Sequence, residues 1–348
     1  MTEQSATTNR QWRVKRYPAT DEPVSNDLFD WVESPLPEPD DGEFLVRTLY
    51  LAPGPAMRGY LEPGHAGFFS TVPVGEVMRG RGIGEVVSSN HPDYQPGDIF
   101  VGSLGWQDYS VQTPRGKEFV FSTKKVEEPP EPLSLELGML GQAGVTAYIS
   151  LTEGGNIKAG DTVLISAAAG GVGSAAGQIA KALGAKRVVG LSSSTEKCAW
   201  LVDNLGLDAA LNYRNDDFDA QLEQQFPDGI DVYLDSVGGE VLNTVLAHLA
   251  MHGRVAVCGF ISTDYDPAAA AGPINYRHLL YKRGRMQGTV VFDHWERFGD
   301  IEAQLRAWHQ SGDIKLCEDV TEGLVNMPQA VEDLFCGNNL GVKICKVA

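Results

Sequence analysis

The chain has 348 residues, 43% of them hydrophobic, which is enough for two domains with ordinary hydrophobic cores. Its 28 basic and 46 acidic residues give a net charge of -18, which disfavours nucleic acid and anionic membranes as partners. No apolar run approaches the ~18 residues of a membrane span, and the polar start lacks the apolar core of a signal peptide. Five scattered cysteines without a CxxC pair argue against a disulfide framework or a structural zinc site. We therefore expect a cytoplasmic protein.

The first 135 or so residues are rich in proline and glycine and contain short segments of alternating polarity. Residues 43–50, 82–87 and 98–102 are examples, and their spacing predicts a compact, barrel-like β domain. The proline-rich stretch 124–135 is typical of an exit from such a domain. The tail segment 341–347 is predicted to be a strand that returns to this first domain.

From about residue 137 to 311, predicted strands and helices alternate. This order is typical of an α/β fold with a doubly wound parallel sheet. We therefore predict a β-rich domain formed by residues 1–136 and 312–348, and a Rossmann domain formed by residues 137–311. The expected strands after the first helix are residues 187–191, 230–235, 254–259 and 285–291.

Residues 163–174, Val-Leu-Ile-Ser-Ala-Ala-Ala-Gly-Gly-Val-Gly-Ser, are the most informative segment of the chain. They predict a buried strand, a tight glycine turn and the start of a helix, the arrangement of a dinucleotide-binding βαβ unit. The N-terminus of that helix presents free N–H groups to an anion. A Cβ at Gly170 or Gly173 would hold the backbone away from a pyrophosphate, or the helix away from the strand.

The end of the second strand indicates which dinucleotide is bound. Enzymes that prefer NAD carry an acidic residue about 20 residues past the turn. Here residues 191–197 read Leu-Ser-Ser-Ser-Thr-Glu-Lys, so the strand ends in hydroxyls and Lys197 follows. Hydroxyls and an ammonium favour a 2′-phosphate and hence NADPH. The alternative is that Lys197 is a solvated charge in the first turn of a helix.

Ten short segments in order along the chain are informative together: residues 9–12, 55–59, 75–78, 105–109, 144–148, 167–174, 235–239, 258–262, 282–286 and 337–341. They resemble the zinc-free branch of the medium-chain dehydrogenase/reductase superfamily. This branch includes prostaglandin reductases, bacterial curcumin reductases and plant alkenal double-bond reductases, and the resemblance runs almost end to end. It implies a Rossmann domain beside a GroES-like, mostly β domain, and a homodimer.

The same resemblance implies a set of NADPH-binding residues. The glycine turn would hold the pyrophosphate, Lys197 and Tyr213 the adenosine phosphate, and the segments near Cys258 and Thr289 the nicotinamide. The full predicted set is Gly170, Gly171, Val172, Gly173, Lys197, Tyr213, Ser236, Cys258, Gly259, Thr289, Val290, Val291 and Asn339.

The reaction implied is the reduction of a carbon–carbon double bond in an α,β-unsaturated ketone or aldehyde. Hydride adds to the β-carbon, and the enolate that forms is then protonated. The branch has a tyrosine just after the Ile-Ser step, here residues 261–262, so the resemblance makes Tyr265 the predicted hydrogen-bond donor to the enolate oxygen. A phenol suits this role because it stays protonated at pH 7. The alternative is that Tyr265 only packs in a loop and that a ribose hydroxyl of the cofactor is the donor. No metal is expected, because no cysteine precedes Cys198.

Tyr60, Phe68 and Phe69 are candidates for the wall of an apolar enone pocket, although aromatic residues in a β domain also form cores. Ala56 and Ser236 stand where the branch often has tyrosine and asparagine, so its individual substrates are not carried over. Three functions therefore stay open: an enone or enal reductase, a relative that reduces quinones or runs the reverse oxidation of a hydroxy lipid, and a non-enzymatic NADPH-binding protein.

Overall fold

The computed structural model describes residues 8–20, 22–64, 70–114, 123–263 and 272–348. The chain divides into two units. Unit 1 comprises Met1–Leu137, Val320–Asn338 and Lys343–Ala348, and unit 2 comprises Gly138–Asp319 and Asn339–Val342.

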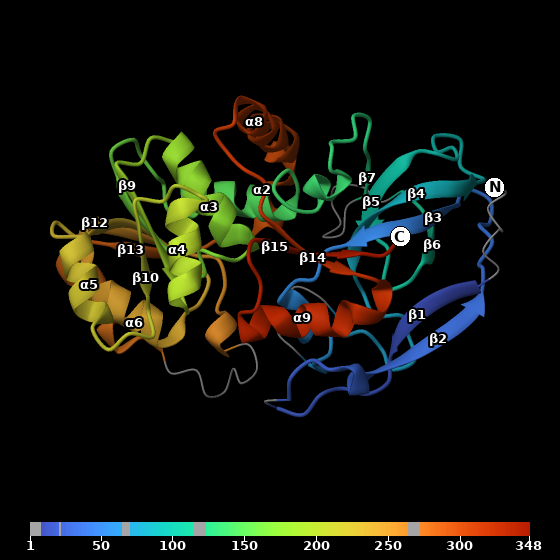
Figure 1. Ribbon diagram of the computed structural model, residues 1–348, viewed down its shortest axis with the longest axis horizontal. Helices are drawn as coiled ribbons and strands as arrows, with labels where there is room; N and C mark the ends of the chain where they lie inside the picture. Colours follow the sequence, from blue (N-terminus) through green and yellow to red (C-terminus); the bar gives the residue numbers. More distant parts are fainter. Residues whose placement is uncertain (1–7, 21, 65–69, 115–122, 264–271) are drawn as a thin grey trace. The chain divides into compact units, whose positions relative to one another are not determined.

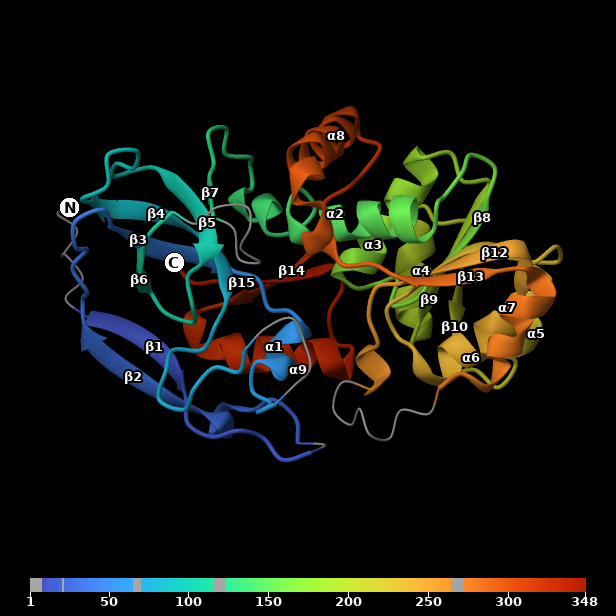
Figure 2. The same cartoon turned by 180° about the vertical axis from the view of Figure 1, so that it is seen from behind.

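Unit 1 is built mainly of antiparallel strands (Figure 2). A two-stranded sheet pairs β1 (Thr8–Val14) with β2 (Phe29–Pro35). The larger sheet has the order β14-β15-β3-β4-β5-β7, and β6 also pairs with β3. The return of β15 to β3 confirms the prediction for the tail strand. The bounds are β3 Phe44–Leu51, β4 Arg81–Ser89, β5 Ile99–Ser103, β6 Tyr109–Gln112, β7 Lys124–Lys125, β14 Glu318–Glu322 and β15 Val342–Lys346, with helices α1 Ala56–Gly59 and α9 Met327–Cys336.

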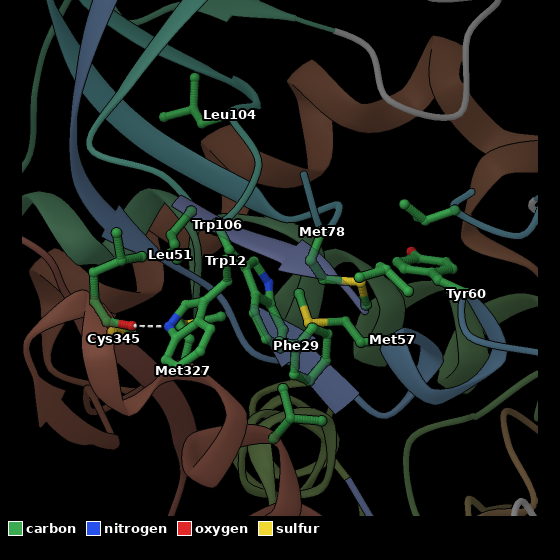
Figure 3. Packing of buried hydrophobic residues seen from close by; sticks show 14 of the residues in the cluster. Trp12, Phe29, Leu51, Met57, Tyr60, Met78, Leu104, Trp106, Met327 and Cys345 are labelled. Atoms are coloured by element: carbon green, nitrogen blue, oxygen red, sulfur yellow. Dashed lines mark hydrogen bonds between the residues drawn. The ribbon is translucent and has the colours of Figure 1, made fainter. Parts of the chain in front are cut away.

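The core of unit 1 joins the ends of the chain. Trp12 from β1 and Trp106 from a loop are both buried there, among methionine and aliphatic side chains (Figure 3). The indole N–H of Trp12 donates a hydrogen bond of 2.9 Å to the carbonyl oxygen of Leu324, 312 positions later. The rings of Phe29 and Trp106 lie with their centroids 4.9 Å apart. Early and late segments therefore form one core.

Unit 2 contains a six-stranded parallel sheet with the order β10-β9-β8-β11-β12-β13 (Figure 1). Helices connect successive strands, so the predicted doubly wound Rossmann architecture is confirmed. The strands are β8 Thr162–Ile165, β9 Arg187–Ser192, β10 Ala209–Asn212, β11 Ile230–Asp235, β12 Leu249–Val257 and β13 Arg285–Gly288. The helices are α2 Gln142–Ile149, α3 Gly171–Ala182, α4 Thr195–Asp203, α5 Phe218–Gln225, α6 Gly239–Ala247, α7 Arg277–Lys282 and α8 Phe298–Ser311.

The central strands β8 and β11 are short apolar runs. Val163, Leu164, Val232 and Leu234 are fully buried, as expected for a sheet covered on both faces. From β8 the chain winds outward through β9 to β10, and after β11 it winds in the opposite direction through β12 to β13. The strand order therefore reverses between β8 and β11, and ligands of open α/β sheets bind at the carboxyl ends of strands at such a point.

Candidate functional site

The predicted cofactor residues of unit 2 gather where its parallel strands end. Gly170 follows β8, Lys197 follows β9 and Tyr213 follows β10, whereas Ser236 follows β11 and Thr289 follows β13. Because the strands are parallel, their carboxyl ends lie along one edge of the sheet (Figure 1). The fold thus places residues from five separate parts of the chain along one edge.

The glycine turn after β8 is tightly packed against the first turn of α3. A Cβ on Gly173 would lie 2.2 Å from the carbonyl oxygen of Ala167, so only glycine fits there. At Gly170, the N-cap of α3, a Cβ would meet only that same oxygen, at 3.3 Å. The helix then runs for 12 residues from Gly171. Gly173 serves close packing, while Gly170 leaves room beside the helix N-terminus, where N–H groups favour a bound anion.

Lys197 lies in the first turn of α4, directly after β9. The hydroxyl of Ser194 caps this helix by accepting a hydrogen bond of 3.2 Å from the Lys197 N–H. The side chain of Lys197 is half-buried, and this burial lowers the pKa of its ammonium, although the charge of Asp319 opposes the shift. The strand end itself carries Ser192, and no acidic side chain stands between it and Ser194. A half-buried cation beside hydroxyls suits a phosphate group.

A short tail segment, residues 339–342, also belongs to unit 2 and lies against the glycine turn. The N–H of Gly341 donates to the carbonyl oxygen of Ala169 at 2.7 Å. Asn339 is buried, and its side-chain amide donates to the carbonyl oxygen of Gly341 at 3.0 Å. Its own carbonyl oxygen accepts from Lys197 at 2.6 Å. The predicted cofactor residues Lys197 and Asn339 are therefore in direct contact.

The end of β11 carries a buried acidic residue, Asp235, for which the sequence pattern predicts no role. Asp235 is 1% exposed, and this burial raises the pKa of its carboxyl group, against hydrogen bonds from Gly238 and Val237. Its main-chain oxygen accepts from the N–H groups of Cys258 and Gly259 at 2.7 and 3.2 Å. The predicted residues after β12 are thus held to the end of β11.

A second buried residue, Ser150, was also missed. It lies where α2 passes into a π-helical segment, Ser150–Gly154, and such segments often occur at functional sites. Its hydroxyl oxygen is 3.4 Å from the hydroxyl of Thr289, whose N–H donates to the carbonyl oxygen of Val257 at 3.0 Å. Val290 and Val291 follow, with Val291 buried. The hydroxyls of Ser150 and Thr289 therefore meet near the ends of β12 and β13.

Cys258 does not have the environment of a reactive thiol. Burial raises the pKa of its thiol, with the hydroxyls of Ser150 and Ser236 opposing the shift. A raised pKa keeps the sulfur protonated, whereas nucleophilic cysteines are thiolates. Cys258 is better suited to packing than to covalent chemistry.

Tyr213 follows β10, and its N–H donates to the carbonyl oxygen of Ser192 at 3.1 Å. Its ring packs against the apolar core of unit 2. This contact brings it beside the end of β9, on the same side as Lys197.

Of the predicted substrate and catalytic residues, the structure describes Tyr60. Tyr60 is buried in the core of unit 1, with the guanidinium of Arg79 4.9 Å from its ring centroid (Figure 3). Burial raises the pKa of the Tyr60 phenol to about 12. Phe68, Phe69 and Tyr265 lie outside the described residues.

Across the described ranges, no cluster of three or more histidine, cysteine or acidic side chains is arranged to hold a metal ion. Nor does this part of the chain contain a helix that is long and apolar enough to cross a membrane.

Comparison with known proteins identifies the family. Residues 10–120 match the model of the N-terminal domain of oxidoreductase, and residues 171–307 match that of zinc-binding dehydrogenase. The chain is 38% identical to the NADPH-dependent curcumin reductase of Escherichia coli, over 98% of this chain and 97% of that protein. It is 36% identical to the NADP(+)-dependent 2-alkenal reductase of Nicotiana tabacum, over 98% of each.

A solved structure agrees with these relatives. CurA from Vibrio vulnificus, in complex with NADPH, superposes with a TM-score of 0.89 at 33% identity, covering 97% of this chain and 99% of that one. Similarity of this extent in sequence and fold shows that the chain belongs to the medium-chain dehydrogenase/reductase superfamily, in the branch of the prostaglandin, curcumin and alkenal double-bond reductases.

Proposed function

We propose that the protein uses NADPH to reduce the carbon–carbon double bond of α,β-unsaturated ketones or aldehydes. The observation that carries the proposal is the row of residues along the carboxyl edge of the unit 2 sheet, from the glycine turn to Thr289. Relatives named as curcumin, alkenal and pulegone reductases, 35 to 38% identical, support the same reaction class.

The residues present fit an NADPH molecule. The open side of Gly170 at the start of α3 suits a pyrophosphate, and Lys197 beside Ser192 and Ser194 suits a 2′-phosphate. The Thr289 to Val291 backbone and the turn at Cys258 would hold the nicotinamide. Bound NADPH would supply the hydride, and the chain's own task is to orient the cofactor and the enone so that the β-carbon faces it.

The enolate oxygen needs a hydrogen-bond donor that is in place before charge develops. We assign this role to Tyr265. Tyr265→Phe should lower kcat by about tenfold or more and change KM little, since the donor acts mainly in the transition state. Tyr276→Phe is the matched control, because that ring is 65% exposed and belongs to the same unit. An unchanged kcat in Tyr265→Phe would transfer the role to a cofactor hydroxyl.

We also propose that catalysis needs no metal. The sequence offers no cysteine before Cys198, so the first domain has no thiolate for the zinc site of metal-dependent relatives. Full activity after exhaustive treatment with a chelator supports this, and activity lost with the chelator and regained with zinc refutes it.

The substrate class is tested with one cofactor and three kinds of compound. Purified protein with NADPH should reduce a small enone to the saturated ketone. Turnover of a quinone alone, or of a hydroxy lipid with NADP+, would place the protein with the alternative activities. Tight NADPH binding with no turnover of any of them would indicate a binding protein.

We further propose a homodimer formed through the outer edge of the unit 2 sheet. All four residues of the edge strand β13 are exposed, and Ile274 and Leu280 nearby are 73% and 76% exposed. Such an edge can pair with another copy of itself. Light scattering should give twice the chain mass, and Leu280→Asp should reduce it, whereas Val325→Asp in unit 1 should not. A monomeric wild type refutes the proposal.

A further inference from the structure

The buried carboxyl group of Asp235 lies at the point where the strand order of unit 2 reverses. It is the last residue of β11, whose neighbour in the sheet is β8. In the register of the two strands Leu234 pairs with Ile165, so Asp235 stands beside Ser166, the first residue after β8. Both side chains are fully or almost fully buried.

One oxygen of this carboxyl group, Oδ1, gathers four donors. It accepts from the N–H groups of Val237 and Gly238 at 3.1 and 3.0 Å. It also accepts from the phenol of Tyr233 at 2.9 Å and from the hydroxyl of Ser166 at 3.4 Å. Asp235 therefore ties the turn that begins α6 to its own strand and to the end of β8.

Ser166 extends this link toward the glycine turn. Its hydroxyl oxygen accepts from the N–H of Ser236 at 2.8 Å. Its single hydroxyl hydrogen is shared between the Leu234 carbonyl oxygen, at 3.2 Å, and Asp235. The next residue, Ala167, has a φ of +46°, and its carbonyl oxygen packs against Gly173. The start of the glycine turn and the end of β11 are thus fixed to each other.

The same turn also holds the chain that follows β12. The main-chain oxygen of Asp235 accepts from Cys258 and Gly259, and that of Ser236 accepts from the N–H of Ile261 at 3.2 Å. Cys258 and Gly259 are predicted to lie along the nicotinamide. Any movement of residues 235–238 therefore moves the segment that is predicted to lie along the nicotinamide.

The carboxyl group of Asp235 does not use its full hydrogen-bonding capacity, as a buried group with a purely structural role would. Its second oxygen, Oδ2, is buried and has no hydrogen-bond partner within the described ranges, although Oδ1 carries four. A buried acceptor without a partner costs free energy, so such groups call for an explanation other than stability.

We propose that Asp235 is a positioning residue for the cofactor, which aligns the glycine turn after β8 with the Cys258 turn after β12. It acts through Ser166 and the turn of residues 236–238, and need not touch the reacting atoms. The proposal rests on the proposed NADPH site but not on the enone chemistry. Its loss should therefore affect NADPH binding as well as hydride transfer.

The chain offers a matched control on the same two strands. Asp231, at the amino end of β11, accepts from the N–H and hydroxyl of Thr162 on β8, both at 2.9 Å. It joins the same strands as Asp235, but four residues away, or about 13 Å along the strand. If Asp235 had only a structural role, replacing Asp235 or Asp231 would have the same effect on NADPH affinity.

The test compares Asp235→Asn with Asp231→Asn in three measurements: NADPH affinity from fluorescence titration without substrate, enone turnover and urea unfolding. Asp235→Asn should raise the Kd for NADPH by about tenfold and lower kcat by about as much, since hydrogen bonds to a carboxylate become weaker bonds to a neutral amide oxygen and an unpaired NH2 group replaces Oδ2. Asp231→Asn should lower stability and leave the Kd within about twofold.

Equal Kd values for the two variants and the wild type would overturn the proposal. Ser166→Ala is the second variant in case Asp235→Asn does not fold, and it should also raise the Kd. If Ser166→Ala folds and binds NADPH as the wild type does, the proposal also fails. A wild type that binds NADPH but reduces no enone would refute the proposed function and still leave this test of Asp235 intact.

Discussion

The ammonium of Lys197 donates a hydrogen bond of 2.6 Å to the main-chain carbonyl oxygen of Asn339, a residue 142 positions later in the chain. Lys197 lies in the first turn of α4, whereas Asn339 belongs to the tail segment that lies against the glycine turn. The contact connects the predicted 2′-phosphate side of the site to its pyrophosphate side through main chain. A lysine held in this way needs little reorganisation to meet a phosphate.

Removing this ammonium should weaken NADPH selectively. Lys197→Ala should raise KM for NADPH by about tenfold or more and barely change KM for NADH, since only NADPH carries the 2′-phosphate. Lys181→Ala is the control, because Lys181 also donates to a carbonyl oxygen, that of Gly206, at 2.6 Å. Equal losses with NADPH and NADH would remove Lys197 from the phosphate site.

The pH dependence of NADPH binding should report the buried lysine. Burial lowers the pKa of Lys197 from 10.5, so the free enzyme loses this charge at a lower pH than an exposed lysine would. KM for NADPH should therefore be constant near neutral pH and rise as the pH increases through the lowered pKa. Lys197→Arg keeps its charge and should not show this rise. The same alkaline rise in both proteins would contradict the assignment.

Gly170 and Gly173, two of the three glycines in the turn, should separate stability from binding. Gly173→Ala places a Cβ 2.2 Å from the Ala167 oxygen and should cost about 1–3 kcal/mol of unfolding free energy or more. Gly170→Ala meets that oxygen at 3.3 Å, a contact that a shift of a few tenths of an ångström relieves, so it should lower Tm less than Gly173→Ala does and weaken NADPH binding. Thermal unfolding and fluorescence titration measure the two effects. Full NADPH affinity in Gly170→Ala would show that the pyrophosphate lies elsewhere.

The two buried indoles of unit 1 should differ in what they contribute to stability. Trp12 donates to the Leu324 oxygen, whereas the indole N–H of Trp106 has no acceptor among the residues with described positions. Trp12→Phe should therefore cost about 1–2 kcal/mol more than Trp106→Phe, since it leaves a buried oxygen unpaired. Urea unfolding of both variants gives the difference. A greater loss with Trp106→Phe would show that ring packing outweighs the hydrogen bond.

Much of unit 2 was predictable because its signals are local. The apolar run before Gly170 and the helix after it differ in periodicity, and parallel topology then brings every strand end to one edge. The proposed role of Lys197 rests on the hydroxyls and the lysine that stand after β9 and on the missing acidic residue there. The tail strand β15 was also predictable from its own residues, 341–347.

The parts that could not be predicted depend on register and packing. Asp235 and Ser166 meet only because β8 and β11 pair with Leu234 opposite Ile165, and no local pattern encodes that register. Ser150 reaches Thr289 only through the π-helical segment that follows α2. Tyr60 is an aromatic residue whose sequence context suits a pocket wall and a core equally, and the structure places it in the core of unit 1.

The most direct measurement follows the hydride itself. NADPH carrying deuterium at both C4 positions is incubated with a small enone, and the product is analysed by NMR and mass spectrometry. We predict a saturated ketone with one deuterium on the β-carbon and none on the α-carbon, formed in equal amount to the NADP+ released. An allylic alcohol with deuterium on the carbon that bears the hydroxyl would contradict double-bond reduction, and so would a product that contains no deuterium.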